Sequence, residues 1–424
     1  MFRTRLGLAS LALVVMCVAP SSVNAYTLNP YNSSYFDNED TNCQCIAASV
    51  RMELMYIDGT TAVTAQSTIN SYAQAHDLLT TTCGSDPQGW AYAMWNYSPA
   101  GYGFNSYSST SQTAQDWELV YGTRADHHPN GALVAAGRHA IDVVGFNTLN
   151  DPWADQTQTL YGFYLLDPWY GRGSSGLPNW PYNGFTPNSY VTVSSWNSLY
   201  FTANTNNTNS RWYNKYVVLL RSSTDAAPAV TPPQSYGDYM YSQLGLAASL
   251  TANNARSTAT AQRTLAPANV SPTIAAAVET GLVQNDLIQG GSLGVDLREA
   301  KIGRSVHVDS LAREVPSYDL VEVSVGSEVR AVAMVTESPG GFSFSALTPW
   351  NGQFDLASPR AVDSALASQG MSGPAHFVWA WTDDGGSPFM PFIRAMDNGT
   401  AGPAYIGPNG KQSQIHLAPG LTAR

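Results

Sequence analysis

Three residues that lie far apart in the chain have the side chains needed for nucleophilic catalysis by a thiol: Cys45, His139 and Asp167. In such chemistry a thiolate attacks a carbonyl carbon, an imidazole takes up and returns the proton, and a carboxylate orients the imidazole and stabilises its charged form. Each residue also has a plainer interpretation: a buried small side chain, a histidine at a strand edge and an Asp-Pro turn, respectively. The elements that carry the three residues decide between these interpretations.

Cys45 lies in the first turn of a helix that we expect from about residue 43 to residue 57. Thr41, followed three residues later by Gln44, fits a capping box, and Gly59 is a plausible helix stop. One face of this helix is apolar, with Ile46, Val50, Leu54 and Ile57. Because the N–H groups at a helix N-terminus favour negative charge, this position stabilises a thiolate over a thiol.

His139 and Asp167 both lie at the ends of expected strands. His139 begins a strand over 140–146, and Asp167 follows a strand over 161–166 and precedes Pro168. A base held on a rigid strand is what proton transfer from a thiol requires. The carboxylate could then accept the imidazole N–H and fix the tautomer.

The remaining patterns predict an α+β fold. In the first part of the chain helices precede strands, with helices expected at 62–79, 86–97 and 112–121 and further strands at 132–136, 190–193 and 216–220. In the second part we expect an antiparallel sheet with added helices, the helices at 236–252, 272–284 and 360–369 and the strands at 318–325, 328–336, 341–347, 376–381 and 390–395. We find no catalytic constellation in this second part.

Length and composition predict two domains in a chain of 424 residues. Residues 222–234 are rich in Ser, Ala and Pro, and 8 of the 11 Trp and 18 of the 23 Tyr precede them. We therefore expect a first domain over 26–225, a linker over 226–234 and an accessory α+β domain over 235–424.

Residues 1–25 have the three parts of a signal peptide: Arg3 and Arg5, an apolar run, and a small residue before Tyr26. The sequence thus predicts a secreted or periplasmic protein. No later run of 18 apolar residues occurs, so no stable membrane insertion is expected. With 20 Lys and Arg against 31 Asp and Glu the chain has no basic stripe, which argues against nucleic acid as a partner.

Removal of the signal peptide, which contains Cys17, leaves three cysteines: Cys43, Cys45 and Cys83. A bridge between Cys43 and Cys45 would be strained by their closeness, so Cys43 with Cys83 is the better pair and leaves Cys45 as a thiol. The alternatives are that Cys83 is the thiol, or that Cys45 is only a small buried side chain.

Three stretches together resemble the papain clan of cysteine peptidases, specifically its bacteriocin-processing peptidase-like branch. Residues 45–49 read Cys-Ile-Ala-Ala-Ser, where that branch typically has Cys-Gly-Pro-Ala-Ser. Residues 139–140 read His-Ala before a strand that ends Val-Gly-Phe at 144–146, and residues 165–171 read Leu-Leu-Asp-Pro-Trp-Tyr-Gly. The resemblance covers roughly residues 30–221.

The resemblance implies a papain-like first domain with Cys45 as nucleophile, His139 as general base and acid, and Asp167 as the residue that orients it. It implies a peptide or protein substrate and neither a metal nor an organic cofactor. Papain-like enzymes often have a disulfide from just before the nucleophile to about forty residues on, and Cys43 and Cys83 match that spacing. The oligomeric state is left open.

The chain departs from the family pattern at Glu39. Papain-like enzymes usually place a Gln about six residues before the nucleophile, where it donates to the developing oxyanion, and an ionised Glu cannot donate. The backbone N–H of Cys45 remains one donor. Candidates for a second donor are Asn38, Asn42 and Gln44.

The leading hypothesis is a secreted cysteine peptidase that works through a thioester acyl-enzyme. One alternative is an amidase or transglutaminase-type thiol enzyme acting on cell-wall or protein amides. Another is a catalytically weak or inactive papain-like binding module, which the Glu39 departure favours.

Other residues with chemical potential have more ordinary interpretations. Asp126, His127 and His128 could ligate a metal but are better explained as a polar loop. Asp142 could be a second carboxylate partner of His139. Most of a set of tryptophans should be core, with one or two lining a cleft: Trp90, Trp95, Trp153, Trp169, Trp180 and Trp196.

Overall fold

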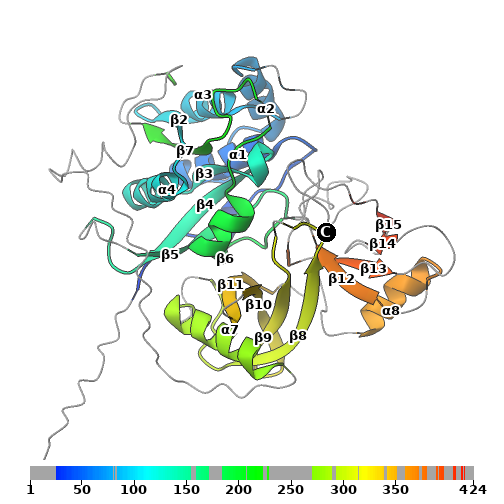
Figure 1. Cartoon of the computed structure of the whole chain (residues 1–424). Helices are drawn as coiled ribbons and strands as arrows, with labels where there is room; N and C mark the ends of the chain where they lie inside the picture. Colours follow the sequence, from blue (N-terminus) through cyan, green and yellow to red (C-terminus); the bar gives the residue numbers. More distant parts are fainter. Residues whose placement is uncertain are drawn as a thin grey trace, which may run out of the picture.

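The structure is a computed structural model of the 424-residue chain (Figure 1). The residues that it describes are 25–79, 81, 84–153, 159–170, 184–206, 208–222, 227–228, 270–288, 293–313, 315–338, 341–350, 359–371, 375–379, 388–389, 391–395, 404–406, 412–413 and 415. The expected signal peptide apart from residue 25, the expected linker apart from residues 227–228, the expected helix over 236–252, and Cys83 lie outside the described residues.

The N-terminal half begins with the expected helices: α1 (Cys45–Asp58), α2 (Gln66–Ala75), α3 (Pro87–Tyr97) and α4 (Gln112–Asp126). The start of α3 illustrates why they form where they do. The carboxylate of Asp86 accepts the backbone N–H groups of Gln88 and Gly89, and Pro87 takes the first helical position. Asp86, the first residue of the helix expected over 86–97, is therefore the N-cap of α3.

The start of α1 differs from the expectation. The helix begins at Cys45 rather than at residue 43, its N-cap is Gln44, and no side chain caps it, so the predicted capping box from Thr41 is wrong. The physical reason is that Cys43 has a left-handed backbone with φ of 70°, which interrupts any helix at that point. The C-terminal end matches, because Gly59 stops the helix with φ of 65°.

The strands of this half are β1 (Tyr26–Leu28), β2 (Gly103–Ser109), β3 (Asn130–Val134), β4 (His139–Thr148), β5 (Leu160–Leu166), β6 (Ser189–Thr192) and β7 (Tyr216–Ser222). Their order in the sheet is β6-β5-β4-β3-β7-β2, all neighbours are antiparallel, and β1 pairs with β4. Short helical turns complete the half: η1 (Ser33–Tyr35), η2 (Ala135–Gly137), α5 (Val193–Ser195) and a π-helical turn, η4 (Trp196–Tyr200).

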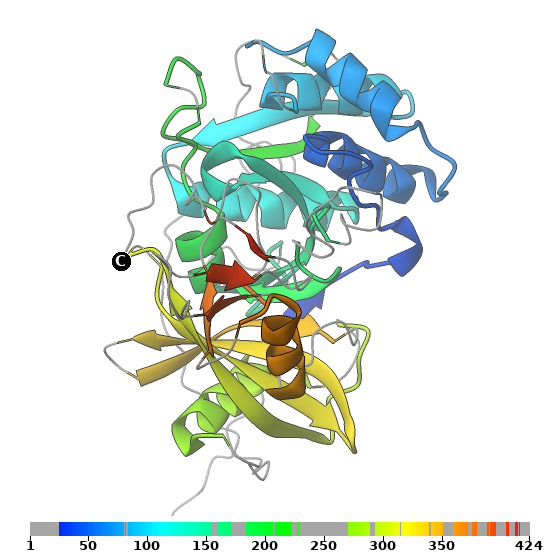
Figure 2. The same ribbon diagram turned by 90° about the vertical axis from the view of Figure 1, so that its right-hand side faces the viewer.

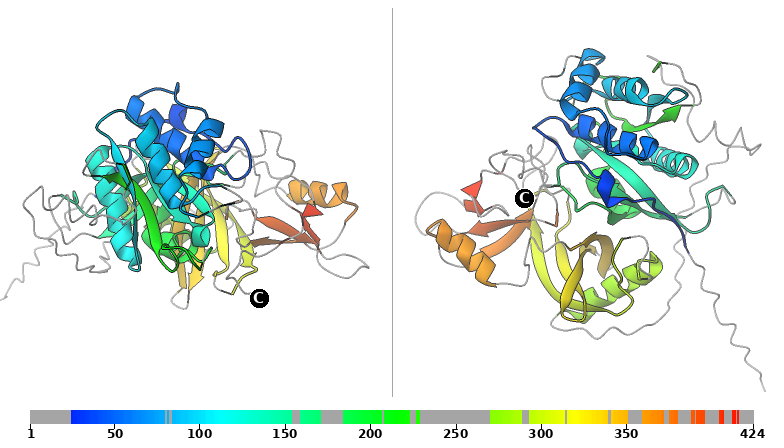
Figure 3. Two further views of the ribbon diagram at one scale, coloured as in Figure 1. Left: turned by 90° about the horizontal axis from the view of Figure 1, so that it is seen from above. Right: turned by 180° about the vertical axis from the view of Figure 1, so that it is seen from behind.

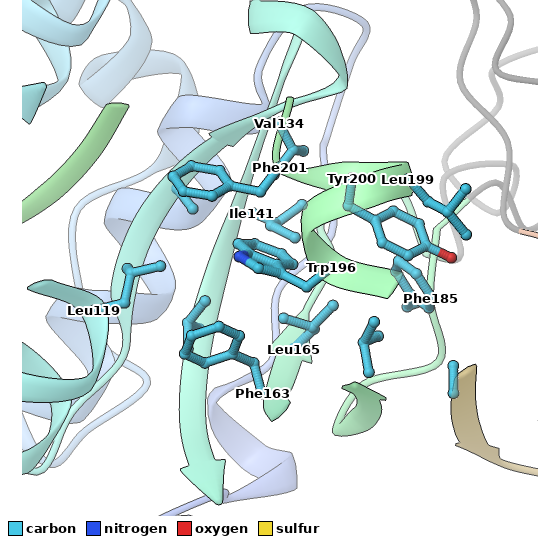
Figure 4. Close-up of a cluster of buried hydrophobic side chains, with 14 of the residues drawn as sticks. Leu119, Val134, Ile141, Phe163, Leu165, Phe185, Trp196, Leu199, Tyr200 and Phe201 are labelled. Atoms are coloured by element: carbon cyan, nitrogen blue, oxygen red, sulfur yellow. The ribbon is translucent and has the colours of Figure 1, made fainter. Parts of the chain in front are cut away.

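Helices cover both faces of this sheet. On one face Ala140 of β4 and Leu219 of β7 pack with α1, α2 and α3. On the other face Ile141 and Val218, one position along each strand, pack with α4. Because side chains of a strand alternate between the two faces, both β4 and β7 are buried on both sides. Figure 4 shows part of the second core, where Ile141 lies near Phe163, Trp196 and Phe201.

The C-terminal half contains α7 (Pro272–Gln284), β8 (Ala300–Ser310), β9 (Tyr318–Val325), β10 (Glu328–Ser338), β11 (Gly341–Pro349), α8 (Pro359–Ser368), β12 (Ala375–Trp379), β13 (Phe392–Ala395), β14 (Ala404–Ile406) and β15 (Gln412–Ser413). The strands β8 to β11 form an antiparallel meander, and β12 joins the sheet by a parallel pairing with β8. Figure 2 shows α7 at the end of the molecule opposite α2 and α3. In both views of Figure 3, α8 and the strands beside it extend to one side.

The two halves share one continuous sheet. β11 pairs with β6, with Ala346 opposite Val191 and Leu347 opposite Tyr190. They also share cores, since Met52 of α1 packs in the same cluster as residues of α7, β9 and β10. The proposed division at residues 226–234 stays a prediction, and the described parts on its two sides are joined by pairing and packing.

The observed architecture is a mixed α/β structure with a large, mostly antiparallel sheet. The α+β character expected from the sequence is confirmed at this level. Strands β1, β2, β8, β14 and β15 were not expected. Among the described residues, no helix has the length and apolar character needed to cross a membrane.

Candidate active site

Cys45 is the first residue of α1, where the backbone N–H groups have no partner within the helix. The helix is anchored by the residues that follow, since Ile46, Ala47 and Val50 are buried against α2 and α3. The Cys45 side chain is partly exposed and is not disulfide-bonded. Cys43 is disulfide-bonded. The specific pairing with Cys83 stays a prediction.

The segment before α1 is held by polar contacts with α1 and α2. The amide of Gln66 accepts the N–H of Asp40 at 3.0 Å and donates to the Asp37 carboxylate at 2.7 Å. Arg51 of α1 forms an ion pair with the same carboxylate at 2.6 Å. These contacts fix the backbone on both sides of Glu39, whose own N–H donates to the carbonyl of Pro168 at 2.9 Å.

His139 is the first residue of β4 and is only 1% exposed. Its Nε2 lies 2.8 Å from Oδ1 of Asp167. The imidazole also stacks on the indole of Trp169, with ring centroids 3.4 Å apart and planes 10° apart. The hydrogen bond and the stack together fix both the tilt and the rotation of the ring. Because a carboxylate accepts, we assign the proton to Nε2.

Backbone donors hold the side chain of Asp167 in place. Its Oδ1 accepts the N–H of Trp169 at 3.0 Å, and its Oδ2 accepts the N–H of Phe185 at 3.1 Å. The residue is 2% exposed, so these bonds and the imidazole replace the lost water. The Asp-Pro-Trp stretch therefore forms a turn that offers both the carboxylate and the aromatic platform to one histidine.

The structure brings Cys45 and His139 together with Glu39. One donor atom of each, the Sγ of Cys45, a ring nitrogen of His139 and a carboxylate oxygen of Glu39, lie within 4.8 Å of one another. All three predicted residues, including Asp167 through its bond to His139, thus belong to one site. Glu39 is 1% exposed, so the residue that departs from the family pattern lies inside the site rather than beside it.

The three candidates for a second oxyanion donor, Asn38, Asn42 and Gln44, lie in the segment just before Cys45. Asn42 is exposed, while Asn38 and Gln44 are partly buried, and the Asn38 backbone carbonyl accepts the Gln66 amide at 2.5 Å. The three amides therefore stay candidates.

A buried carboxyl pair lies between α1 and β4, the elements that carry Cys45 and His139. Glu53 of α1 and Asp142 of β4 are both 0% exposed, and Ser49 of α1 lies beside them. Burial first, and then the neighbouring Asp142, raise the pKa of Glu53 well above its ordinary value of 4.5. Burial also raises the pKa of Asp142 well above its ordinary value of 3.8. Two adjacent buried carboxyl groups cannot both ionise cheaply, so the pair holds at least one proton.

This pair connects the two elements that carry the candidate thiol and imidazole. Cys45, Ser49 and Glu53 are spaced four residues apart along one stripe of α1. Asp142 shares a face of β4 with Ala140, the face that α1 covers. Asp167, not Asp142, is the carboxylate bonded to Nε2 of His139. No role for Ser49 or Glu53 was predicted from the sequence.

The other candidates have structural roles. Asp126 forms an ion pair with Arg221 at 3.3 Å, and His128 is buried with its Nδ1 2.8 Å from the carbonyl of Pro129. His127 ends α4 in a left-handed conformation. Within the described parts of the chain, only one group of three or more His, Cys, Asp or Glu side chains is close enough together to hold a metal. It consists of Glu39, Cys45 and His139.

The tryptophans divide between core and site. Trp90 and Trp196 are fully buried, and Trp153 is partly exposed beneath the guanidinium of Arg124, 4.4 Å from the ring. Trp169 is the one that the site uses, as the platform under His139. Trp180 lies outside the described residues.

Comparison of the chain with family models, with curated proteins and with solved structures found no match. The class of the site follows from its own geometry: a thiol at a helix N-terminus beside an imidazole that is hydrogen-bonded to a buried carboxylate.

Proposed function

We propose that the chain is a secreted, papain-like cysteine peptidase that cleaves peptide bonds through Cys45, His139 and Asp167. The observation that carries the proposal is the 2.8 Å bond between Asp167 and Nε2 of His139, with a ring nitrogen of His139 and the Sγ of Cys45 within 4.8 Å. This is the order of contacts that thiol, base and orienting group need for nucleophilic catalysis.

The geometry supports the following division of roles. Because Nε2 is turned to Asp167, Nδ1 is the nitrogen that would take the thiol proton of Cys45. The thiolate would attack the scissile carbonyl, and the backbone N–H of Cys45 would donate to the developing oxyanion. His139 would then protonate the leaving amine and activate the water that releases the acyl-enzyme.

The environment of His139 suits this exchange of protons. Asp167 stabilises the imidazolium that forms, and the N–H groups of Trp169 and Phe185 hold its side chain in place. The indole of Trp169 covers one face of the imidazole and keeps water from the hydrogen bond to Asp167. The ring can therefore change its charge without changing its position.

Glu39 favours a second candidate function, a binding module of little or no turnover. When ionised, the Glu39 carboxylate within 4.8 Å of the thiol would oppose the negative charge that attack creates, and it would supply no donor for an oxyanion. The same thiol site would also serve an amidase or transglutaminase-type enzyme. Activity measurements on defined substrates separate the three functions.

The test is hydrolysis of a library of internally quenched peptides by the full mature chain. We expect cleavage that Cys45→Ala and His139→Ala abolish and that His307→Gln leaves unchanged. His307 is a suitable control because it is a half-exposed histidine on β8 that contacts Asp309 and Asp319, in the other half of the chain. Cleavage that survives in Cys45→Ala, or no cleavage of any peptide, contradicts the proposal.

A further inference from the structure

The donor atoms of Glu39, Cys45 and His139 form a set of three different chemical types. A thiol sulfur, an imidazole nitrogen and a carboxylate oxygen lie within 4.8 Å of one another, and Glu39 and His139 are each 1% exposed. Calcium and magnesium prefer oxygen ligands alone, whereas zinc takes sulfur, nitrogen and oxygen together. The set therefore favours zinc over calcium and magnesium.

The spacing of the three donors suits one small ion. In a tetrahedral zinc site, bond lengths of about 2.0–2.3 Å place neighbouring ligand atoms about 3.3–3.6 Å apart. The donor atoms here are already within 4.8 Å. A closure of about 1 Å brings the three atoms to this spacing, and the Cys45 side chain is partly exposed at the end of α1.

The surroundings of His139 also match those of a zinc ligand. Histidines that bind metal nearly always donate their other ring N–H to a carboxylate or a carbonyl, which fixes the tautomer and raises the basicity of the ligating nitrogen. Here Nε2 is bonded to Asp167 at 2.8 Å. Asp167 is in turn held by the N–H of Phe185 at 3.1 Å, so the supporting shell is complete without any rearrangement.

The charges balance as well. A thiolate from Cys45 and the carboxylate of Glu39 together carry two negative charges, which a divalent ion neutralises in a site that excludes most water. A glutamine here, as papain-like enzymes usually have, would leave the site with one negative charge instead of two. Its amide oxygen would also be a weaker metal ligand than a carboxylate oxygen. Glu39 is thus the residue that distinguishes this site as a metal site.

We propose that Glu39, Cys45 and His139 bind one Zn²⁺ ion, with a water molecule in the fourth position, and that the bound ion blocks the nucleophile. The binding part of the proposal stands on the donor set alone. The inhibitory part rests on the proposed peptidase function, because an ion on the sulfur of Cys45 removes the lone pair that attack requires.

The test of binding uses metal salts and no substrate. Titration of the full mature chain, freed of metal with EDTA and dialysed, with ZnCl₂ should give one site by calorimetry. Titration with CoCl₂ should give a sulfur-to-cobalt charge-transfer band that ZnCl₂ removes. Glu39→Gln should weaken zinc binding more than roughly 10-fold, the lower end of what loss of a mere outer-shell partner costs.

Two further variants make the result specific. Cys45→Ser should abolish the charge-transfer band, and His307→Gln should leave zinc affinity unchanged, although His307 also lies within 3.5 Å of two carboxylates. Near-ultraviolet circular dichroism identifies any variant that is unfolded. If Glu39→Gln does not fold, the zinc affinity of Cys45→Ser tests the proposal instead. The absence of a saturable site, or zinc affinity unchanged in both Glu39→Gln and Cys45→Ser, overturns the proposal.

The two parts fail separately. If zinc binds as described but no peptide is cleaved at any metal concentration, the peptidase function fails and the metal site stands. If peptides are cleaved in EDTA and zinc inhibits in proportion to the calorimetric occupancy, both stand. Cleavage that zinc accelerates, or leaves unchanged at full occupancy, overturns the inhibitory part.

Discussion

His139 at the start of β4 and Asp167 at the end of β5 meet through a hydrogen bond of 2.8 Å between Nε2 and Oδ1. The two strands are antiparallel neighbours, with Asp142 opposite Leu166, so the first residue of β4 and the last residue of β5 lie at the same end of the strand pair. The N-terminus of α1 places Cys45 at this end. Three segments separated in sequence are therefore aligned by the sheet.

Asp167→Asn should impair catalysis far more than folding. An amide at this position can present its NH₂ group to Nε2 and so favour the wrong tautomer, which we expect to lower kcat by about 10³–10⁴. KM should change little, because the 2% exposed Asp167 is turned to His139. Steady-state kinetics with a cleaved peptide measure both constants.

The matched control for this variant is Asp151→Asn. Asp151 also accepts a hydrogen bond from a side-chain nitrogen, that of Arg124 at 2.8 Å, but does so on the partly exposed surface at the end of α4. Its loss should leave kcat unchanged. A kcat of Asp167→Asn within threefold of the parent would show that Asp167 does not orient the base.

Trp169→Leu should loosen the imidazole, whereas Trp169→Phe should not. Leucine keeps apolar bulk but loses the stack at 3.4 Å, and aromatic pairs contribute about 0.5–1.5 kcal/mol beyond their buried area. We expect the leucine variant to lose about that much stability relative to the phenylalanine variant, and to have the lower kcat. Urea unfolding and kinetics on the pair test this, and equal kcat values for the two would contradict it.

Glu53→Gln should change how stability depends on pH. Burial and Asp142 raise the pKa of Glu53 above 4.5, so the folded state holds a proton that the unfolded state releases. The stability from this proton is complete below pH 4.5 and falls as pH rises toward the folded-state pKa, by at most about 1.4 kcal/mol per pH unit. Glutamine does not ionise, so it removes this loss at position 53.

Urea unfolding at pH 4 and pH 8 measures the effect. Glu53→Gln should gain stability relative to the parent between these values, while the exposed control Glu328→Gln should follow the parent, since Glu328 pairs with Arg330 on the surface. Parallel curves for Glu53→Gln and the parent would mean that Glu53 holds no extra proton in the folded state.

Asp116→Asn should behave in the same direction over a defined range. Burial in α4 raises the pKa of Asp116 from 3.8 to about 7, although Asn197 and Trp196 both donate to it. The parent should therefore lose up to about 4 kcal/mol relative to the variant as pH rises from 3.8 to 7. Thermal or urea unfolding across this range checks it, and a variant that is least favoured at pH 7 contradicts it.

Several elements could be predicted to within a residue because local signals agree with the fold. The helix expected over 272–284 is α7, which has Pro272 at its first position, and the strand expected over 318–325 is β9. By contrast, β2 was missed because it buries polar residues such as Asn105 and Ser106. β8 was missed because charged side chains and Gly303 interrupt its pattern.

The site was predictable where residue type and element position coincide, and not where packing decides. Cys45, His139 and Asp167 each lie at the end of an element, which the sequence indicates. Glu53 is an acidic residue within a helix, which ordinarily faces water, and only the packing of α1 on β4 buries it. The inward placement of Glu39 likewise depends on contacts from Gln66, which is distant in sequence.

The most direct test of the central claim is alkylation of the mature chain by iodoacetamide at about pH 6, with EDTA and without reductant, followed by peptide mass spectrometry. If His139 and the start of α1 maintain a thiolate, Cys45 is labelled selectively in the folded protein and His139→Ala slows the labelling strongly. His307→Gln leaves the rate unchanged. Labelling of Cys45 only after unfolding, or at the same rate in His139→Ala, would contradict the account.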